Sequence, residues 1–265
     1  SIVKNNDQYT LTSVGVLNNI DRTITQTVVI LNNNYPDGIP DAFNYSIYVR
    51  GNLQLGNTTG SSIQGNLMSG GSINVGNGWA INGNIQSNAQ IDFPYADFNA
   101  YEDFISENYG ASHVINGNFT FADNQTYTGL YYVNGNVDFG RNVTLNGGVV
   151  SEGTVNLRHS DNLTINSNPN EPAIISEGNI NISDAQNVNL TGNGLIYTEQ
   201  GISLQRAEDS TFVGVFIVYQ TMNVANIDGV SIIFNPAIPQ NPPRYFPGWV
   251  DNSVIVNNER NWQEI

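Results

Sequence analysis

Short apolar-polar-apolar triplets, separated by Gly and Asn, fill most of the chain. The small-residue turns between them recur at regular distances, and Gly117, Gly135 and Gly153 are spaced by 18 residues. We call the stretch of chain between two such turns a line. Each line holds two triplets and closes with a third short apolar stretch. Alternation with a period of two predicts short strands that bury one face.

A repeat of strands and turns with a period near 20 residues is typical of a β-solenoid, whose rungs bury their apolar faces by stacking on one another. We therefore predict a right-handed parallel β-helix of roughly nine rungs, about 40 Å long at a strand spacing of about 4.8 Å. The predicted inward column contains Val137, Val155, Ile180 and Ile202, and the outward column beside it contains Asp138, Asn156, Asn181 and Ser203. Asn-Gly pairs at 82–83, 116–117 and 134–135 suit the corners, because both residue types tolerate positive φ.

One segment departs from the strand pattern. In "DFPYADFNAYEDFISENYG" apolar residues recur at helical spacing between 98 and 105, which predicts one short helix near 95–109. Pro94 suits its entry and Gly110 its C-terminal cap. We interpret this helix as a cover for the solenoid core; the alternative is one wall of an aromatic ligand groove.

The two ends of the chain do not share the repeat. Two β-rich runs within residues 9–31 flank "NNID", which predicts an antiparallel hairpin. The C-terminal "SVIVNNERNWQEI" adds another apolar strand. We therefore predict an all-β chain in which residues 44–243 form the solenoid, inserted in a small antiparallel sheet made of residues 1–43 and 244–265.

Composition narrows the classes of function. Lys and Arg total 8 against 23 Asp and Glu, a net charge of −15, which argues against a nucleic-acid partner because phosphate binding relies on basic side chains. The absence of cysteine excludes a disulfide framework and thiolate metal sites. No apolar run is long enough for a transmembrane helix. Low charge with abundant Asn, Thr, Ser and Gly predicts an extracellular location at the cell surface.

The opening "YTLTSVGV", followed by "RTITQTVVI", resembles the hairpin after the N-terminal helix in PilX-like minor pilins of type IV pilus systems. The stretches "FNYSIYVRGNLQLGN" and "GNLMSGGSINVGNGWAINGN" are similar to the start of a β-helical insertion that some of these proteins carry, and "WQEI" resembles their Trp-x-Glu ending. The resemblance implies a structural and adhesive component at or near the filament tip. Its partners would be other pilin subunits and an outer target such as a glycan or a cell surface. The apolar N-terminal helix that anchors such pilins in the membrane is missing from this chain.

A second hypothesis is a secreted carbohydrate-active or carbohydrate-binding β-helix protein. Hydrolases need a pair of carboxylates, whereas the outward column offers Asp138 alone, so we predict no catalytic residues and no enzyme activity. Charged residues concentrate instead where the two triplets of each line meet: Arg141, Arg158, His159, Asp161, Asp184, Arg206, Glu208 and Asp209. We interpret this set as a salt-bridge ladder; the alternative is a lyase-type site with an arginine base.

A few residues are candidates for ligand or metal binding. For a ligand, they are the corner residues Arg141, Arg158 and Arg206 with the aromatic residues Tyr245 and Trp249. Further candidates for stacking on sugar rings are Tyr131, Tyr132, Tyr197, Tyr219 and Phe246, and several of these aromatic residues must instead pack the core. In "NNNYPDGIPDAF", Asp37 and Asp41 flank a glycine in the manner of a calcium loop, although Asp-Gly is also a common turn. The sequence suggests no cofactor other than calcium at this loop, and His113 is expected to be a hydrogen-bonded structural residue.

Overall fold

The structure is a computed structural model that describes residues 39–246 in full and, outside them, the backbone of five strands. The chain divides into two compact units, residues 1–38 with 248–265 and residues 39–247. The first unit contains a five-stranded sheet; the second contains the repeats.

The sheet of the first unit is antiparallel and combines strands from both ends of the chain. Strand β2 (Gln8–Leu17) and strand β3 (Ile20–Val29) form the predicted hairpin, with Leu17 paired to Ile20 across a two-residue connection. Strand β1 (Ile2–Asn5) pairs with β2, and the C-terminal strands β28 (Ile255–Val256) and β29 (Gln263–Glu264) both pair with β3. The repeats are therefore an insertion between strands of one sheet.

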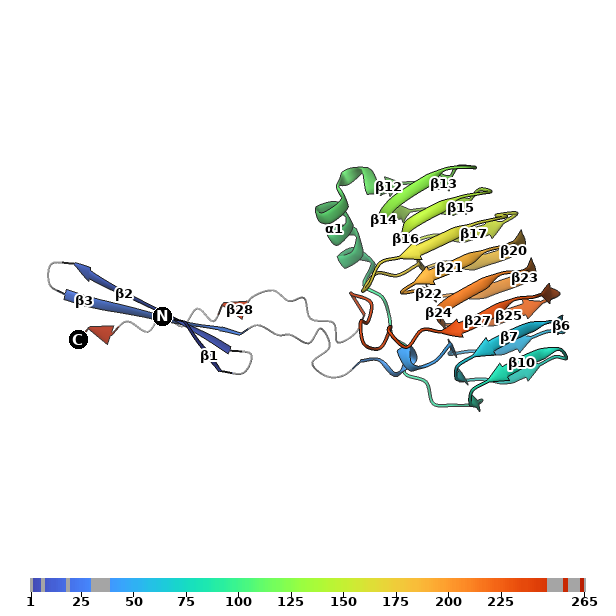
Figure 1. Cartoon of the computed structure of the whole chain (residues 1–265), viewed down its shortest axis with the longest axis horizontal. Coiled ribbons are helices and arrows are strands. Elements are labelled where there is room, and N and C mark those ends of the chain that lie inside the picture. The colour runs from blue at the N-terminus through green and yellow to red at the C-terminus, as the bar shows by residue number, and fades with distance from the viewer. Residues whose placement is uncertain are drawn as a thin grey trace. The chain divides into compact units, whose positions relative to one another are not determined.

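The repeats form a parallel β-solenoid of about nine turns, which confirms the predicted fold class (Figure 1). Each complete turn contributes one strand to each of three faces. We call them the covered face, the asparagine face and the threonine face.

The covered face contains β12 (Val114–Asn116), the second halves of β14 (Thr126–Asn134), β16 (Thr144–Ser151) and β24 (Thr211–Val218), and β19 (Ile174–Ser176), β22 (Leu195–Thr198), β4 (Ile47–Val49), β8 (Leu67–Ser69) and β11 (Ile85–Gln86).

The asparagine face contains β13 (Phe119–Phe121), β15 (Val137–Phe139), β17 (Val155–Arg158), β20 (Ile180–Gln186), β23 (Ile202–Glu208), β25 (Met222–Ala225), β5 (Leu53–Leu55) and β9 (Ile73–Val75). The threonine face contains the first halves of β14, β16 and β24, with β18 (Thr164–Ser167), β21 (Asn189–Gly192), β27 (Ser231–Phe234), β7 (Ser61–Gln64) and β10 (Trp79–Asn82). Short strands β26 (Ile227–Asp228) and β6 (Thr58–Thr59) pair at the corner that follows the asparagine face.

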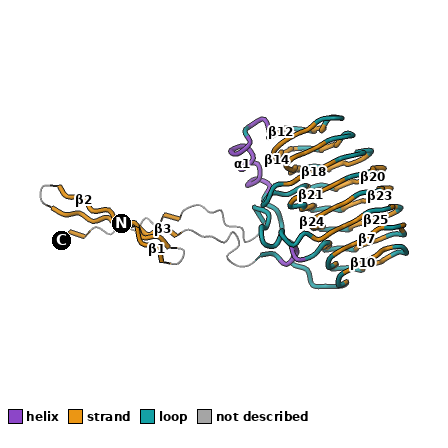
Figure 2. The backbone as a smooth tube through the Cα atoms, in the orientation of Figure 1, coloured by secondary structure: helices purple, strands orange, loops and turns teal. Residues whose placement is uncertain are grey.

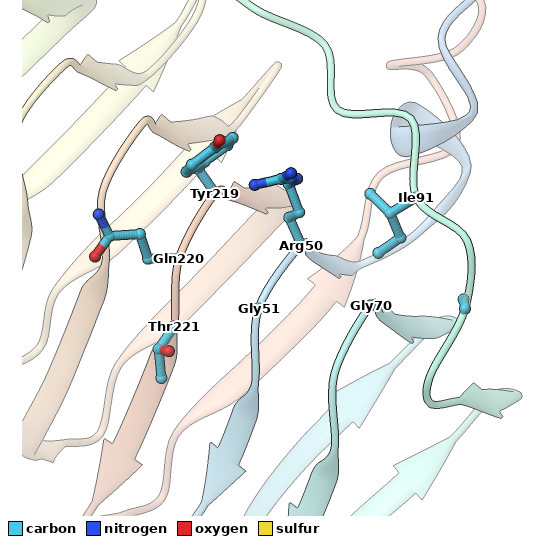
Figure 3. A pocket seen from close by; sticks show the side chains of 8 residues that line it. Arg50, Gly51, Gly70, Ile91, Tyr219, Gln220 and Thr221 are labelled. Atoms are coloured by element: carbon cyan, nitrogen blue, oxygen red, sulfur yellow. The ribbon is translucent and has the colours of Figure 1, made fainter.

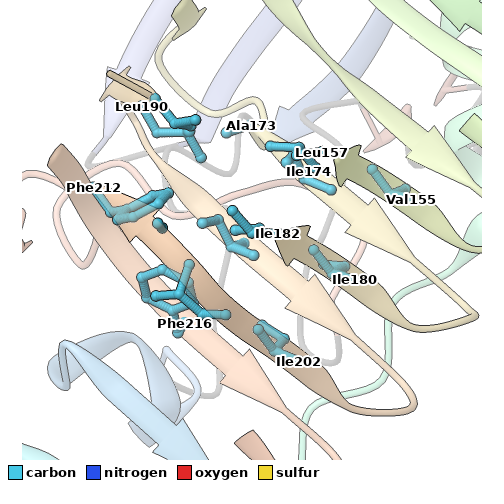
Figure 4. Close-up of a cluster of buried hydrophobic side chains, with 14 of the residues drawn as sticks. Val155, Leu157, Ala173, Ile174, Ile180, Ile182, Leu190, Ile202, Phe212 and Phe216 are labelled. Carbon is cyan, nitrogen blue, oxygen red and sulfur yellow. The ribbon is translucent and has the colours of Figure 1, made fainter. Parts of the chain in front are cut away.

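The interior is built from columns of aliphatic and aromatic side chains, one residue per rung (Figure 4). The predicted column Val137, Val155, Ile180 and Ile202 is paired in register and at most 2% exposed. Glycines stack at the preceding corner, where a Cβ added to Gly135 would lie 2.6 Å from the carbonyl carbon of Gly117. Close approach of successive corners therefore explains the recurring glycines.

The rungs do not stack in chain order. Strands β4, β5 and β7 pair with β24, β25 and β27, so the first rungs of the sequence continue the sheets beyond the last ones. Strands β9, β10 and β11 then form the outermost rung at that end, and residues 87–113 lead to the opposite end, where β12 and β13 begin (Figures 1 and 2). The sequence repeat alone did not reveal this order.

The predicted helix is present as α1 (Phe98–Tyr109). The Asp97 side chain accepts a hydrogen bond from the Ala100 backbone N–H at 3.0 Å, and Gly110 ends the helix with φ 89°. The buried residues Tyr101 and Ile105 face inward. Two short 3-10 helices, η1 (Asp41–Asn44) and η2 (Ala111–His113), accompany it. No helix in the described part of the chain is long and apolar enough to cross a membrane.

Segments outside the rungs bury the outward side of the covered face. Its outward residues Tyr132, Val150, Ile175, Tyr197, Ile217 and Tyr48 are at most 2% exposed. Tyr197 packs against Phe93 and Phe246, with ring centroids 5.6 and 5.2 Å apart, and its hydroxyl accepts a hydrogen bond from the Ala96 N–H at 3.2 Å. In the rungs between the two ends, the third apolar stretch is thus a strand buried on both sides, whereas β11 and β12 in the end rungs are not.

Candidate functional site

The threonine face presents short polar side chains in two registered columns. The first column contains Thr126, Thr144, Thr164, Asn189, Thr211, Ser231 and Ser62. The second contains Thr128, Asn146, Asn166 and Thr191. All of these side chains are exposed or half-buried, and none of the strands of this face carries a charged residue.

Hydrogen bonds hold the second column in order. Asn166 donates its Nδ2–H to Oδ1 of Asn146 at 2.9 Å, and the Thr191 hydroxyl donates to Oδ1 of Asn166 at 2.6 Å. Parallel strands place such groups about 4.8 Å apart along the solenoid and about 6.6 Å apart along each strand. In the rungs from β14 to β21 the face is therefore a regular grid of hydroxyl and amide groups, whereas in β24 and β27 the residues two places beyond the first column are Val213 and Ile233.

The grid was missed by sequence reasoning, which followed the neighbouring asparagine face. Its signal is nevertheless present as the related tetrapeptides "TLNG", "TINS" and "NLTG" at residues 144–147, 164–167 and 189–192. The outward column that was predicted, beginning at Asp138, does exist: Asn156 donates to Asp138 at 3.0 Å, and Asn181 donates to Asn156 at 2.9 Å. The two exposed faces thus carry similar amide ladders.

Asparagines with a left-handed backbone conformation form the corner between the asparagine face and the threonine face. Asn124, Asn142, Asn162 and Asn187 occupy equivalent places in successive rungs, with φ between 55° and 59°. Each of the last three donates a side-chain amide N–H to the Oδ1 of the preceding member, at 2.8 to 3.1 Å. Because asparagine tolerates the left-handed region better than most residues, one residue type serves both the turn and the ladder. The predicted Asn-Gly corners differ: positive φ occurs at the glycines Gly117 and Gly135, and at 82–83 neither residue has a positive φ.

The predicted charged residues lie at this same corner. Arg206 forms a two-pronged ion pair with Asp184, with Nη2 2.7 Å from Oδ2, and Arg141 Nε lies 3.5 Å from Asp161 Oδ2. The hydrogen bond from Arg206 lowers the pKa of the Asp184 carboxyl. The outward side chain of Arg158 is exposed. Among the described residues the structure therefore joins four of the eight predicted residues in two ion pairs, which is part of the ladder expected from the alternating charges.

A surface pocket of about 330 Å³ opens at the corner, lined by Asp161, Asp184, Gln186, Arg206 and Glu208. A carboxyl that is held below its usual pKa remains ionised, whereas a general acid needs a raised pKa. Asp184 is therefore suited to ion pairing rather than to proton donation.

A second pocket of about 430 Å³ lies where the covered face meets the asparagine face (Figure 3). The Arg50 guanidinium stacks over the Tyr219 ring at 4.4 Å, and Ile91 and Gln220 also line the pocket. Glu199 lies nearby, and burial raises the pKa of its carboxyl, with the charge of Glu177 acting in the same direction. The pocket thus combines one cation with one aromatic face.

The sugar-stacking candidates fall into three groups. Tyr132, Tyr197 and Phe246 are at most 3% exposed and belong to the cover of the solenoid, so they are the candidates that pack inside and cannot stack on a sugar. Tyr131, Tyr219 and Tyr245 are half-buried, and Tyr245 packs against Tyr101 at 5.1 Å. Trp249 lies outside the described residues. His113 has the structural role predicted for it: its Nδ1 lies 3.1 Å from the Leu130 carbonyl oxygen, and its ring stacks on Tyr131.

The calcium candidates are only partly described. Asp37 lies outside the described residues, and the exposed Asp41 begins η1, where it accepts a hydrogen bond from Asn44 at 3.4 Å. Within residues 39–246, no group of three or more His, Asp or Glu side chains is placed to hold a metal ion.

Comparisons with known proteins found similarity among solved structures alone. No protein-family model and no curated protein matches the chain. Among solved structures, an ice-binding protein from an Antarctic biological consortium is 16% identical, covers 74% of this chain and 91% of its own, and has a TM-score of 0.39. An ice-binding protein from the Antarctic ascomycete Antarctomyces psychrotrophicus is 13% identical, covers 72% of this chain and 95% of its own, and has a TM-score of 0.35.

Proposed function

We propose that the solenoid binds a solid surface with a repeating hydrogen-bond pattern through its threonine face, and that ice is the surface it binds. The observation that carries the proposal is the uncharged grid of threonine and asparagine side chains in register across successive rungs. A ligand that repeats at similarly short intervals can meet many of these groups at once.

The physical advantage of the grid is that it is ordered before binding. Threonine is β-branched and restricted at χ1, and the amides of Asn146 and Asn166 are already joined by a hydrogen bond. Less side-chain entropy is therefore lost when a surface is engaged. The absence of charge also avoids the cost of stripping water from ionised groups.

Ice is a lattice of hydrogen-bonding water molecules and meets this description. The two structural neighbours are ice-binding proteins by name, although the proposal rests on the threonine face and not on that weak similarity.

The test introduces charge on one face and compares it with the same charge on another. Thr144→Lys/Thr164→Lys places two lysines in neighbouring rungs of the threonine face; Asn181→Lys/Ser203→Lys does so on the asparagine face. Inhibition of ice recrystallisation by the unaltered chain, lost in the first variant and kept in the second, is the expected result. No inhibition by the folded, unaltered chain would overturn the proposal, and so would equal loss in both variants. Adsorption to crystalline cellulose or chitin without any effect on ice would assign the same face to a polysaccharide instead.

A second candidate function concerns how the solenoid is displayed: as the ectodomain of a type IV pilus minor pilin. The favouring observation is that β28 and β29 pair with β3, so that a small antiparallel sheet brackets the insertion. Other pilin subunits would pack with the segment that carries this sheet, and the solenoid would face a cell surface or glycan outside the cell.

Reading the gene upstream of Ser1 tests this candidate. An apolar stretch of about 20 residues retained in the mature protein is expected, because such a helix both spans the membrane and packs in a filament. A conventional signal peptide cleaved next to Ser1 would contradict it and leave a free, secreted solenoid.

A further inference from the structure

The outermost rung at one end of the solenoid leaves part of the interior open. This open end consists of β9 (Ile73–Val75), β10 (Trp79–Asn82) and β11 (Ile85–Gln86). Its apolar side chains continue the buried columns, since Val75 pairs with Leu55 and Ile85 pairs with Leu67. Leu55 and Leu67 are at most 2% exposed, whereas Val75 is 44% and Ile85 50% exposed.

Within residues 39–246, the open end also lacks the features that protect exposed strand edges. Natural proteins place charges, prolines or covering segments at such edges to prevent pairing with other chains. Here no charged residue and no proline occurs from residue 51 to residue 91, in a chain whose net charge is −15. An uncharged, apolar end with unpaired strand edges is a surface suited to association.

The opposite end is closed by its own aromatic side chains. Phe121 is fully buried, and Phe119 stands 4.9 Å from Phe121 and 6.0 Å from the stacked ring of Tyr131. Tyr127 packs against Phe121 at 4.9 Å. The two ends therefore differ, and the aliphatic open end is the one that exposes its interior columns.

Stacking of rungs does not require a continuous chain. Within the molecule, β27 pairs with β7 and β25 pairs with β5 although these strands lie far apart in sequence. The Thr58 hydroxyl donates to the Ile227 carbonyl oxygen at 2.8 Å across this junction, and the partners are 169 residues apart. Rungs from separate segments thus join through the same sheets as consecutive rungs.

We propose that two copies of the chain associate through their open ends. A single peptide strand can pair with one edge of the outermost rung, whereas a second three-sided rung can pair with β9, β10 and β11 together and cover the columns of Val75 and Ile85. Because the same end meets itself, the association is two-fold and closes as a dimer, with the strands of the two copies antiparallel.

Sedimentation velocity of the full chain over a range of concentrations tests the proposal. A concentration-dependent dimer is expected, and Val75→Lys/Ile85→Lys converts it to a monomer by placing like charges in the contact. The matched control, Asn74→Lys/Gln86→Lys, adds the same two charges to the same strands on their outward side and stays dimeric. A monomer at every concentration, as expected if another part of the chain covers the open end, would overturn the proposal. Open-ended polymers would overturn the two-fold arrangement.

Hydrogen exchange on the unaltered chain provides a second measurement that needs no variant. Slower exchange of the amides of residues 73–86 as concentration rises is expected, with no change at β12 and β13. Protection confined to another surface would contradict association through the open end.

Discussion

The covered face and the threonine face are made by the same rungs, yet one is buried and the other is bare. Strands β14, β16 and β24 contribute their first halves to the threonine face and their second halves to the covered face. Outward from the covered face stand Tyr132 and Tyr197, under α1 and the segments beside it; outward from the threonine face stand Thr144 and Thr164, with no described segment over them. The backbone is similar, so the outward side chains make the difference. One face stabilises the fold, and the other is free to recognise a surface.

The largest effect is expected on the covered face. Tyr197→Ala removes a fully buried ring that packs against Phe93 and Phe246, and should lower the free energy of unfolding by about 3–5 kcal/mol, measured by urea denaturation. Tyr197→Phe keeps the ring and loses the hydroxyl bonds to Ala96 and Glu199, so a loss of about 1 kcal/mol is expected. A loss below 1 kcal/mol in the alanine variant would mean that the cover contributes little to stability.

The corner beside the threonine face should show an intermediate effect. Asn142 has φ 55° and joins Asn124 and Asn162 through side-chain hydrogen bonds. Asn142→Val forces a β-branched residue into the left-handed region and breaks the ladder, at an expected cost of about 1–2 kcal/mol in the free energy of unfolding. Asn142→Gly breaks the same ladder without the backbone strain and should cost less. Equal losses in thermal unfolding of the two variants would contradict the role given to the backbone.

A smaller and pH-dependent effect is expected at the edge of the covered face. Burial raises the pKa of Glu199, so its ionised form is less favourable in the folded state than in the unfolded state. Its contribution to stability is fully present below the unfolded pKa and is lost as pH rises through the folded pKa. Glu199→Gln should therefore raise the free energy of unfolding at neutral pH, by less than about 1 kcal/mol because the group is partly exposed, and the gain should vanish in acid. A gain that is independent of pH would exclude this cause.

The smallest effect on stability is expected on the threonine face. Thr164→Ala removes a half-buried hydroxyl from the grid and should change the free energy of unfolding by no more than about 0.5 kcal/mol. Calorimetric melting of this variant beside Tyr197→Ala compares the two faces directly. A similar destabilisation in both would remove the distinction between a face for stability and a face for recognition.

Much of the repeat was readable from the sequence because strand periodicity is local. The inward column from Val137 to Ile202 and the outward residues beside it were assigned from alternation alone, and the charged corner followed from the same alignment. The helix was readable from its spacing and from Gly110. The threonine grid was not predicted from the sequence, although its tetrapeptides repeat. Thr and Asn are also common in turns, so the pattern did not show that these side chains face solvent together.

The amino-acid sequence by itself determined that this protein is an all-β solenoid with a bracketing sheet, since two-residue alternation, corner glycines and helical spacing act over short distances. Only the tertiary structure decided that Tyr132, Tyr197 and Phe246 lie in a covered core, because the elements that bury them come from distant segments. It also decided that β4, β5 and β7 stack on β24, β25 and β27, which leaves Val75 and Ile85 exposed at the open end. Rungs with equivalent edges can stack in several orders, and the path of the chain between them selects one.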